Sequence, residues 1–196
     1  MSSATPIDAA MWRELVDYCP STGALRWKVK VSQRQIGQRA DTRGSSRGYR
    51  QVVYRGRKYL AHRIIFALIN GEGPRGYVDH INGNPSDNRA WNLRGCEQWQ
   101  NSLNGAMRSD NTTKFKGVSA VISGGTTQYR AAIKNHGRTY FLGLFDSKES
   151  ASAAYQGAAR VIGGGFFSDG DRRQVSPEQE MAELRARLAQ LEAQSA

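Results

Sequence analysis

Apolar residues divide the chain into stretches of different periodicity, and each periodicity predicts a different element. Residues 7–18 show helical spacing, which predicts an amphipathic helix. Its apolar face consists of Ile7, Met11, Leu15 and Tyr18. From 24 to 60 the pattern changes to short runs interrupted by Gly48 and Gly56, which is typical of strands joined by turns. Residues 62–71 are almost all apolar, so we expect a helix buried against those strands.

The stretch from Tyr77 to Asn104 changes character three times within a short length. An apolar strand ends at Asp79 and His80, and a loop rich in asparagine and glycine follows. A second strand-like run begins at Trp91, and residues 97–104 can form a short helix. Strand, loop, strand and helix make a small scaffold on which four polar side chains can converge, namely Asp79, His80, Asn92 and Asn101.

A polar stretch without periodicity, 105–113, follows and is typical of a linker. Three strand patterns and a helix then occupy 114–168, with a hairpin turn at 135–137 and Ser147 as the helix cap. Strand alternation predicts an exposed face formed by Gln128, Arg130, Lys134, Arg138 and Tyr140. On the other face we expect Ala132, Phe141 and Phe145 to pack against the helix.

The tail, 176–194, has the pattern of a helix that begins with a capping box at Ser176. Its apolar positions are Met181, Leu184, Leu188 and Leu191. They make two heptads, fewer than a convincing coiled coil needs, so docking on the same chain and dimerisation stay equal alternatives. The whole pattern predicts an α+β protein of three units, namely 1–104, 114–168 and this helix.

Charge points to a polyanionic partner. The chain of 196 residues carries 28 Lys+Arg against 17 Asp+Glu, a net charge of +11, and nucleic acid is the simplest match. Residues 22–63 hold twelve basic residues and one acid, Asp41, which indicates a surface that faces phosphates. Our candidates on this surface are Arg43, Arg47 and Lys58.

Nothing in the sequence predicts export or membrane insertion. The first residues lack the apolar core of a signal peptide, and no apolar run approaches the length that spans a bilayer. Cys19 and Cys96 are far apart and have no metal-binding spacing, so we interpret them as reduced thiols. The expectation is a cytoplasmic protein without a membrane partner.

The spacing of polar residues in the strand-loop-strand-helix stretch resembles the ββα-metal active site of HNH endonucleases. Asp79-His80 is followed by Asn92 twelve positions later and by Asn101 nine positions after that. The resemblance is greatest to the homing endonucleases whose third signature residue is asparagine, and it covers roughly 59–104. It implies a core that cleaves double-stranded DNA and a role for Asn92 in holding the loop and orienting His80.

These residue types match what the hydrolysis of a phosphodiester requires. A hard divalent cation stabilises the charge on the reacting phosphate and on the leaving oxygen. Mg²⁺ prefers oxygen ligands, which Asp79 and Asn101 supply, and Mn²⁺ is the alternative metal. His80 is then free to act as general base. Asn88 is an alternative to Asn92, and Glu97 lies one helical turn before Asn101. We expect His62 to be a buried, hydrogen-bonded histidine, with a place in the site as the alternative.

The unit over 114–168 resembles the Apetala-two/ERF DNA-binding domain. The resemblance is carried by Lys116-Gly117-Val118, by 129–133, by 142–145 and by the alanine-rich helix around Tyr155. It implies a sheet that lies in the major groove of DNA, and it adds Lys116 to the candidate DNA contacts.

The resemblance to HNH homing endonucleases implies a phage- or intron-type enzyme. One chain holds one copy of the site, so we expect a monomer that nicks one strand, with a dimer through 176–194 as the alternative. Because all four site residues precede 105–113, we also expect the part up to Asn104 to cleave by itself. The rival hypotheses are a sequence-specific DNA-binding regulator with an inactive nuclease core, and a nuclease that acts on RNA.

Overall fold

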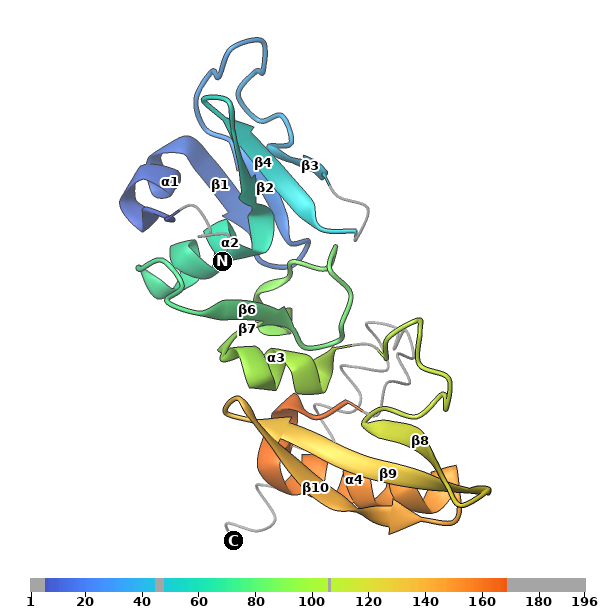
Figure 1. Ribbon diagram of the computed structural model, residues 1–196. Helices are drawn as coiled ribbons and strands as arrows, with labels where there is room; N and C mark the ends of the chain where they lie inside the picture. Colours follow the sequence, from blue (N-terminus) through green and yellow to red (C-terminus); the bar gives the residue numbers. More distant parts are fainter. Residues whose placement is uncertain (1–5, 45–47, 106, 169–196) are drawn as a thin grey trace, which may run out of the picture.

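The computed structural model describes residues 6–44, 48–105 and 107–168, which form three parts stacked along one axis (Figure 1). The N-terminal part consists of α1 (Ala9–Leu15), β1 (Val16–Cys19), β2 (Ala24–Trp27), β3 (Asp41–Arg43), β4 (Arg50–Tyr54), β5 (Arg57–Leu60) and α2 (Ala61–Asn70). β1 pairs with β2, while β3, β4 and β5 form a separate antiparallel sheet. The predicted α+β fold class is confirmed.

The first helix is shorter than its apolar pattern predicts. α1 begins after Asp8, whose side chain accepts hydrogen bonds from two backbone N–H groups, and it ends at Leu15. The chain then becomes strand β1, because Val16 pairs with Trp27 of β2. Tyr18 therefore lies in a strand, and the helix predicted over 7–18 is wrong from Val16 onward.

α2 packs as its composition predicts. Ile64 and Ile65 are fully buried in one core with Trp12 of α1 and Trp27 of β2. The helix ends where Gly71 adopts a left-handed conformation, φ 79°, that a residue without a side chain reaches easily. This core fixes α2 against β4 and β5, directly above the central part of the molecule.

The central part has the predicted order of strand, loop, strand and helix. β6 (Tyr77–His80) pairs antiparallel with β7 (Leu93–Cys96), and the loop between them includes the 3-10 helix η1 (Ala90–Asn92). α3 (Gln98–Asn104) follows and packs on β6. Glu97 and Gln100 begin this helix with reciprocal side-chain to backbone hydrogen bonds, a capping box.

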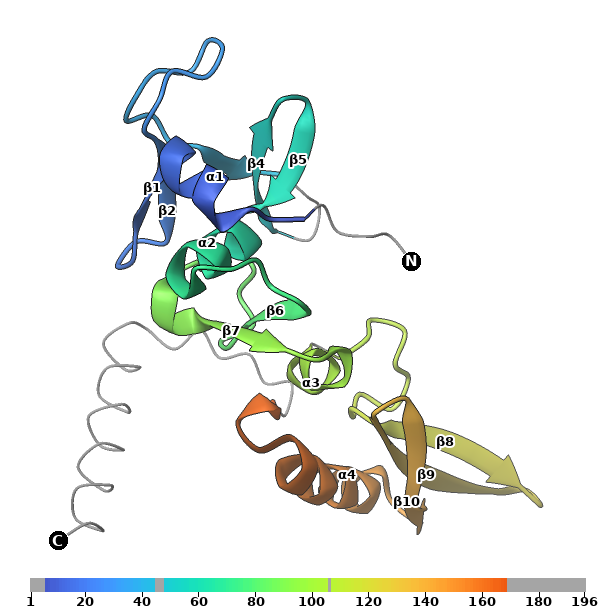
Figure 2. The same ribbon diagram turned by 90° about the vertical axis from the view of Figure 1, so that its left-hand side faces the viewer.

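The C-terminal unit is a three-stranded sheet with one helix on it (Figure 2). It comprises β8 (Val118–Ser123), β9 (Thr126–Asn135), β10 (Arg138–Phe145), α4 (Lys148–Gly163) and the 3-10 helix η2 (Gly164–Phe166). The strand order is β10-β9-β8, and α4 packs against all three strands. Ser147 caps α4 as the sequence predicts.

The two faces of this sheet differ from the prediction. Ala131 and Ile133 are buried on the side of α4, so Arg130, Ala132 and Lys134 point to the free side. Phe141 pairs with Ala132 and is 58% exposed, so the prediction that both pack on the helix is wrong. Phe145 does join the core with Ala151.

The turn between β9 and β10 explains the error. It pairs Asn135 with Arg138 and Lys134 with Thr139. Between the turn and the register shift after Phe141, even-numbered residues of β9 therefore share a face with odd-numbered residues of β10. Tyr140 lies opposite Ile133, on the helix side. Arg138 and Tyr140 therefore do not share the face of Arg130 and Lys134, as the alternation had predicted.

α3 belongs to two parts of the molecule at once. Leu103 is buried together with Ile133, Tyr155 and Ala159 of the C-terminal unit, and Trp99 packs against the same cluster. At the end of α3, the Lys116 ammonium donates hydrogen bonds to the backbone carbonyls of Leu103 and Gly105. The stretch predicted to be a linker thus connects two units that share a core.

The last residues of that stretch are themselves ordered by hydrogen bonds. The Asn111 side chain accepts from the backbone N–H groups of Thr113 and Lys114, and Thr113 is buried. The predicted 176–194 helix and Arg47 lie outside the described residues. Among those that are described, no helix has the length and apolar composition to cross a membrane.

Candidate active site

Asp79 and His80 end strand β6, and both side chains are buried. Consecutive strand residues point to opposite sides, and these two have different neighbours. Asp79 faces Arg94 and Asn104, while the His80 ring faces Asn88 and the N-terminal part. Within the described chain, no hydrogen bond or ion pair joins the two side chains directly.

Four N–H···O contacts surround the Asp79 carboxylate. The amide nitrogen of Asn104 lies 3.0 and 2.9 Å from its two oxygens, and Nε and Nη2 of Arg94 lie 3.0 and 2.9 Å from Oδ2. The same Asn104 amide donates to the His80 carbonyl at 2.8 Å. Asn104 therefore ties α3 to the end of β6, a role that the sequence analysis did not assign to it.

Asn101, the predicted metal ligand, lies on α3 three residues before Asn104 and is half-buried. Three residues of an α-helix turn about 300°, so Asn101 and Asn104 are about 60° apart on the surface of α3. Its side chain forms no hydrogen bond with any described residue. The i, i+3 spacing of Asn101 and Asn104 makes both candidates for the site from the sequence, but it gives no reason to prefer Asn104.

The carboxylate at the end of β6 and the asparagine side chains of α3 are residue types that fit a hard divalent cation. A carboxylate and amide oxygens are ligands that Mg²⁺ and Mn²⁺ accept, usually together with water. No group of three or more His, Cys, Asp and Glu side chains is arranged for a metal within the described ranges. A metal at Asp79 would therefore be held by this carboxylate and by the amide oxygen of Asn101 or Asn104.

On the other side of the strand, one hydrogen bond with a described residue holds the His80 ring. Its Nε2 lies 2.9 Å from Oδ1 of Asn88, which is 1% exposed. An amide oxygen only accepts, so Nε2 carries the proton and Nδ1 is left as the basic nitrogen. Burial lowers the pKa of His80 below its ordinary 6.5, although the Asn88 bond and the nearby Asp79 oppose this.

His62 is a neighbour of His80 that the sequence analysis took to be hydrogen-bonded. Its ring centroid lies 5.0 Å from that of His80 in an edge-to-face arrangement and 5.3 Å from the ring of Tyr49. Its Nδ1 is buried and has no hydrogen-bond partner in the described structure. Burial, together with the charge that His80 and Arg63 can carry, lowers the pKa of His62 to about 3. The ring is therefore neutral at physiological pH.

Asn92 holds the loop and does not contact His80. Its Oδ1 accepts from the Asn82 backbone N–H at 2.9 Å, and its Nδ2 donates to the Asp87 carbonyl at 2.7 Å. The loop-holding part of its expected role agrees with these contacts. Orientation of His80 belongs instead to Asn88, the alternative that the sequence left open.

Glu97, the other alternative, points away from this cluster. Its carboxylate accepts a hydrogen bond from Trp99 Nε1 at 2.8 Å and lies 3.5 Å from Nδ1 of His136. These partners lie at the start of α3 and in the turn between β9 and β10. The structure does not bring Glu97 to Asp79.

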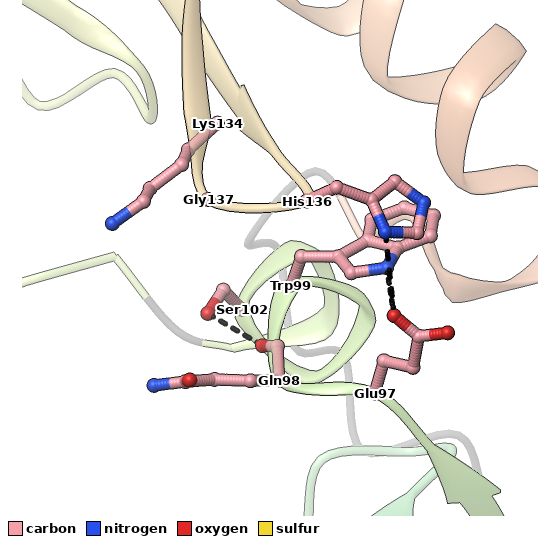
Figure 3. A pocket seen from close by; sticks show the side chains of 7 residues that line it. All are labelled: Glu97, Gln98, Trp99, Ser102, Lys134, His136 and Gly137. Atoms are coloured by element: carbon pink, nitrogen blue, oxygen red, sulfur yellow. Dashed lines mark hydrogen bonds and ion pairs between the residues drawn. The ribbon is translucent and has the colours of Figure 1, made fainter.

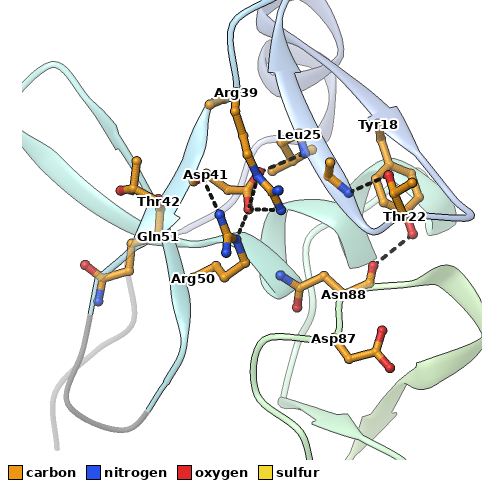
Figure 4. Close-up of polar contacts among 12 residues, drawn as sticks. Tyr18, Thr22, Leu25, Arg39, Asp41, Thr42, Arg50, Gln51, Asp87 and Asn88 are labelled. Carbon is orange, nitrogen blue, oxygen red and sulfur yellow. Dashed lines mark hydrogen bonds and ion pairs between the residues drawn. The ribbon is translucent and has the colours of Figure 1, made fainter. Parts of the chain in front are cut away.

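The N-terminal part contacts the loop between β6 and β7 at Asn88 (Figure 4). The Tyr18 hydroxyl donates to the Asn88 carbonyl at 3.0 Å, and burial raises the pKa of this hydroxyl so that it remains a donor. Gly23, at φ 69°, lies so close to the Asn88 backbone that an added Cβ would come within 2.6 Å of it. The β1-β2 hairpin therefore fixes the residue that orients His80.

Part of the basic N-terminal surface serves this same hairpin. Asp41 is buried and pairs with Arg39 and Arg50, and its carboxylate accepts from the Leu25 backbone N–H at 3.0 Å (Figure 4). Those two arginines are therefore paired with a carboxylate of the protein itself, although Arg39 remains exposed to solvent. Arg43 and Lys58 remain exposed candidates for phosphate contact.

The candidate DNA contacts of the C-terminal unit separate into two groups. Arg130 and Lys134 are exposed on the free face of the sheet, and Gln128 is half-buried beside them. Lys116 differs, because its ammonium donates to the backbone at the end of α3. Its expected DNA contact therefore competes with a structural role.

Comparison with known proteins bears on the central part of the chain. Residues 59–103 match the family model described as HNH endonuclease, a segment that includes Asp79, His80, Asn92 and Asn101. An uncharacterized HNH endonuclease of Acanthamoeba polyphaga mimivirus is 32% identical over 111 residues, which are 56% of this chain and 56% of that protein. The chain thus spans about half the length of this relative. No solved structure matches the chain.

Proposed function

We propose that the protein is a metal-dependent DNA endonuclease of the HNH homing type, encoded by a phage or an intron, and that it nicks one strand. The observation that carries the proposal is the position of the family match, because 59–103 encloses the buried pair Asp79 and His80. The net charge of +11 supports a nucleic acid as substrate.

In the proposed reaction, His80 takes a proton from the attacking water. Its Nδ1 is the basic nitrogen because Nε2 donates to Asn88, and burial lowers the pKa of the ring, which favours its neutral form. Asn92 keeps the loop in the shape that presents Asn88. A divalent metal held by Asp79 and an asparagine of α3 supplies charge stabilisation at the phosphate.

The C-terminal unit is proposed to bind the same DNA, in the manner that its resemblance to Apetala-two/ERF domains implies. A three-stranded sheet with a helix on one face leaves the other face for the major groove. Arg130 and Lys134 on that face supply charge, and Phe141 supplies an apolar contact. Localisation in the cytoplasm and a monomeric state complete the proposal.

One observation favours the rival hypothesis of a DNA-binding regulator without cleavage. Arg94 and Asn104 already satisfy the Asp79 carboxylate, and a core that no longer binds metal would need this compensation. Incubation with supercoiled plasmid in Mg²⁺, in Mn²⁺ and in EDTA separates the hypotheses. A nickase accumulates open-circular DNA with metal only, and Asp79→Ala and His80→Ala do not. A regulator retards the plasmid in a gel in all three buffers and leaves it supercoiled.

A further inference from the structure

A groove lies between α3 and the turn that joins β9 to β10 (Figure 3). It encloses about 380 Å³, and its walls come from the central part on one side and from the C-terminal unit on the other. Lys134, which belongs to this groove, also lies on the free face of the sheet beside Arg130. DNA on that face would therefore reach the groove.

The two ends of the groove differ chemically. At one end, Glu97 is engaged by Trp99 and His136, whose ring centroids are 4.9 Å apart. At the other end, the Lys134 ammonium and the Gln98 amide extend to the same side (Figure 3). Neither of these two groups has a hydrogen-bond partner among the described residues. The first end is internally satisfied, and the second offers a cation and a neutral N–H donor.

We infer that this second end binds a phosphate of the DNA backbone, held jointly by Lys134 and Gln98. A phosphate oxygen needs a positive charge and N–H donors, and both are present without a competing partner. The Glu97 carboxylate is directed toward Trp99 and His136, so it does not oppose an anion at the Lys134 end. The inference rests on the proposed function, since it assumes a DNA substrate.

Helical geometry relates this phosphate site to the candidate active site. Gln98, Asn101 and Asn104 follow one another in steps of about 60° around α3, so Asn101 lies between the groove and the residue that contacts Asp79. Along the axis, Gln98 and Asn104 are about 9 Å apart. That is about two to three base-pair steps of 3.4 Å. A phosphate at Lys134 would therefore set which phosphodiester lies over Asp79.

Binding measured in EDTA tests the site without depending on cleavage. The probe is a 30-base-pair duplex, with affinity followed by fluorescence anisotropy over a range of salt concentrations. Each phosphate contact contributes about 0.9 to the slope of log Kobs against log salt, so Lys134→Gln should reduce the slope by about that amount. The matched control is Lys148→Gln on α4, which covers the opposite face of the sheet and should leave the slope unchanged.

A double-mutant cycle tests whether two residues from different parts share one phosphate. Gln98→Ala should weaken binding roughly 2- to 10-fold, the range of one hydrogen bond, without changing the salt slope. Combined with Lys134→Gln, it should add much less than its separate effect, whereas with Lys148→Gln the effects should multiply.

Multiplicative effects for Lys134 and Gln98, or an unchanged slope for Lys134→Gln, would overturn the groove site. Failure of the proposed function has a different signature. A protein that shows the coupling in EDTA but never nicks plasmid with Mg²⁺ keeps the phosphate site and loses the nuclease. A protein that nicks without the coupling does the reverse.

Discussion

Asp79 and His80 are neighbours in sequence, yet different ends of the molecule support them. The ring of His80 is held by Asn88, which in turn is fixed by Tyr18 and Gly23 of the N-terminal part. The carboxylate of Asp79 is held by Arg94 and Asn104, which depend on the C-terminal unit. The proposed base and the proposed metal ligand can therefore be disturbed independently.

The dependence of the Asp79 side on the C-terminal unit has two structural causes. α3 buries Leu103 against Ile133 and Ala159, so its position is set by that unit. Arg94 donates to the Gly165 carbonyl at 2.5 Å and lies 3.8 Å from the centre of the Phe166 ring. The unit therefore has a structural role besides its proposed DNA contacts, because it packs against Arg94, which holds the candidate metal ligand.

Truncation after Asn104 should have the largest effect. It exposes Leu103, removes the Lys116 ammonium that donates to the end of α3, and removes Gly165, which accepts from Arg94. We therefore expect α3 to lose its place and nicking to fall to background. This replaces the expectation, drawn from the sequence, that 1–104 is active by itself. Plasmid nicking and circular dichroism measure the outcome, with 1–168 as the control. A truncated protein that nicks at the wild-type rate would show that α3 needs no outside support.

Loss of the proposed base, His80, should lower the cleavage rate without changing metal binding at Asp79. His80→Ala should lower the rate by about 10²- to 10⁴-fold, the usual contribution of a general base, while Mn²⁺ binding by calorimetry and DNA binding stay unchanged. Asp79→Ala should abolish Mn²⁺ binding as well. In the wild type the rate should rise with pH and level off above the lowered pKa of His80, hence with a midpoint below 6.5. A midpoint above 6.5 would show that another group titrates.

Asn88→Ala should be the next most severe change. It leaves the His80 Nε2–H buried without an acceptor, which costs about 1–3 kcal/mol, or roughly 5- to 150-fold in rate. Asn88→Asp restores an acceptor and should recover part of the rate. Single-turnover nicking measures both, and circular dichroism confirms the fold. Equal rates for Asn88→Ala and wild type would remove Asn88 from the positioning of His80.

Substitution of Arg94 should change metal binding at Asp79 and leave the surroundings of His80 unchanged. Partners that orient a metal ligand typically contribute 10- to 100-fold to affinity or activity, so Arg94→Lys should weaken Mn²⁺ binding within that range. Phe166→Ala removes only the ring beside the guanidinium and should weaken it a few-fold. Arg160→Lys is the control, because Arg160 lies beside Phe167 and does not contact Asp79. Unchanged Mn²⁺ affinity in Phe166→Ala would disconnect the C-terminal unit from the metal ligand.

The sequence predicts the order of the central elements because each has a local cause. Strand β6 ends in an Asn-Gly turn, and the capping residues begin α3. The Asn88 contact has no local cause, since it depends on how the loop folds over the β1-β2 hairpin. The core around Leu103 could not be predicted either, because the polar stretch before Lys114 has the composition of a linker between separate units. Phe141 is assigned to the wrong face because the two-residue turn determines which side chains of β10 point to each face of the sheet, and the sequence alone does not reveal its pairing.

The smallest expected effect concerns His62, and it tests the His80 side through stability. The pKa of His62 is about 3 in the folded protein and near its ordinary 6.5 when unfolded. Between these values the unfolded chain binds more protons, so stability falls as pH falls from 6.5 and is independent of this group above it. One proton changes the free energy of unfolding by at most about 1.4 kcal/mol per pH unit.

Urea titrations between pH 4.5 and 7 measure this dependence. The slope of the free energy of unfolding against pH should be shallower for His62→Phe than for wild type. Equal slopes for His62→Phe and wild type would mean that the folded protein accommodates a charged ring beside His80.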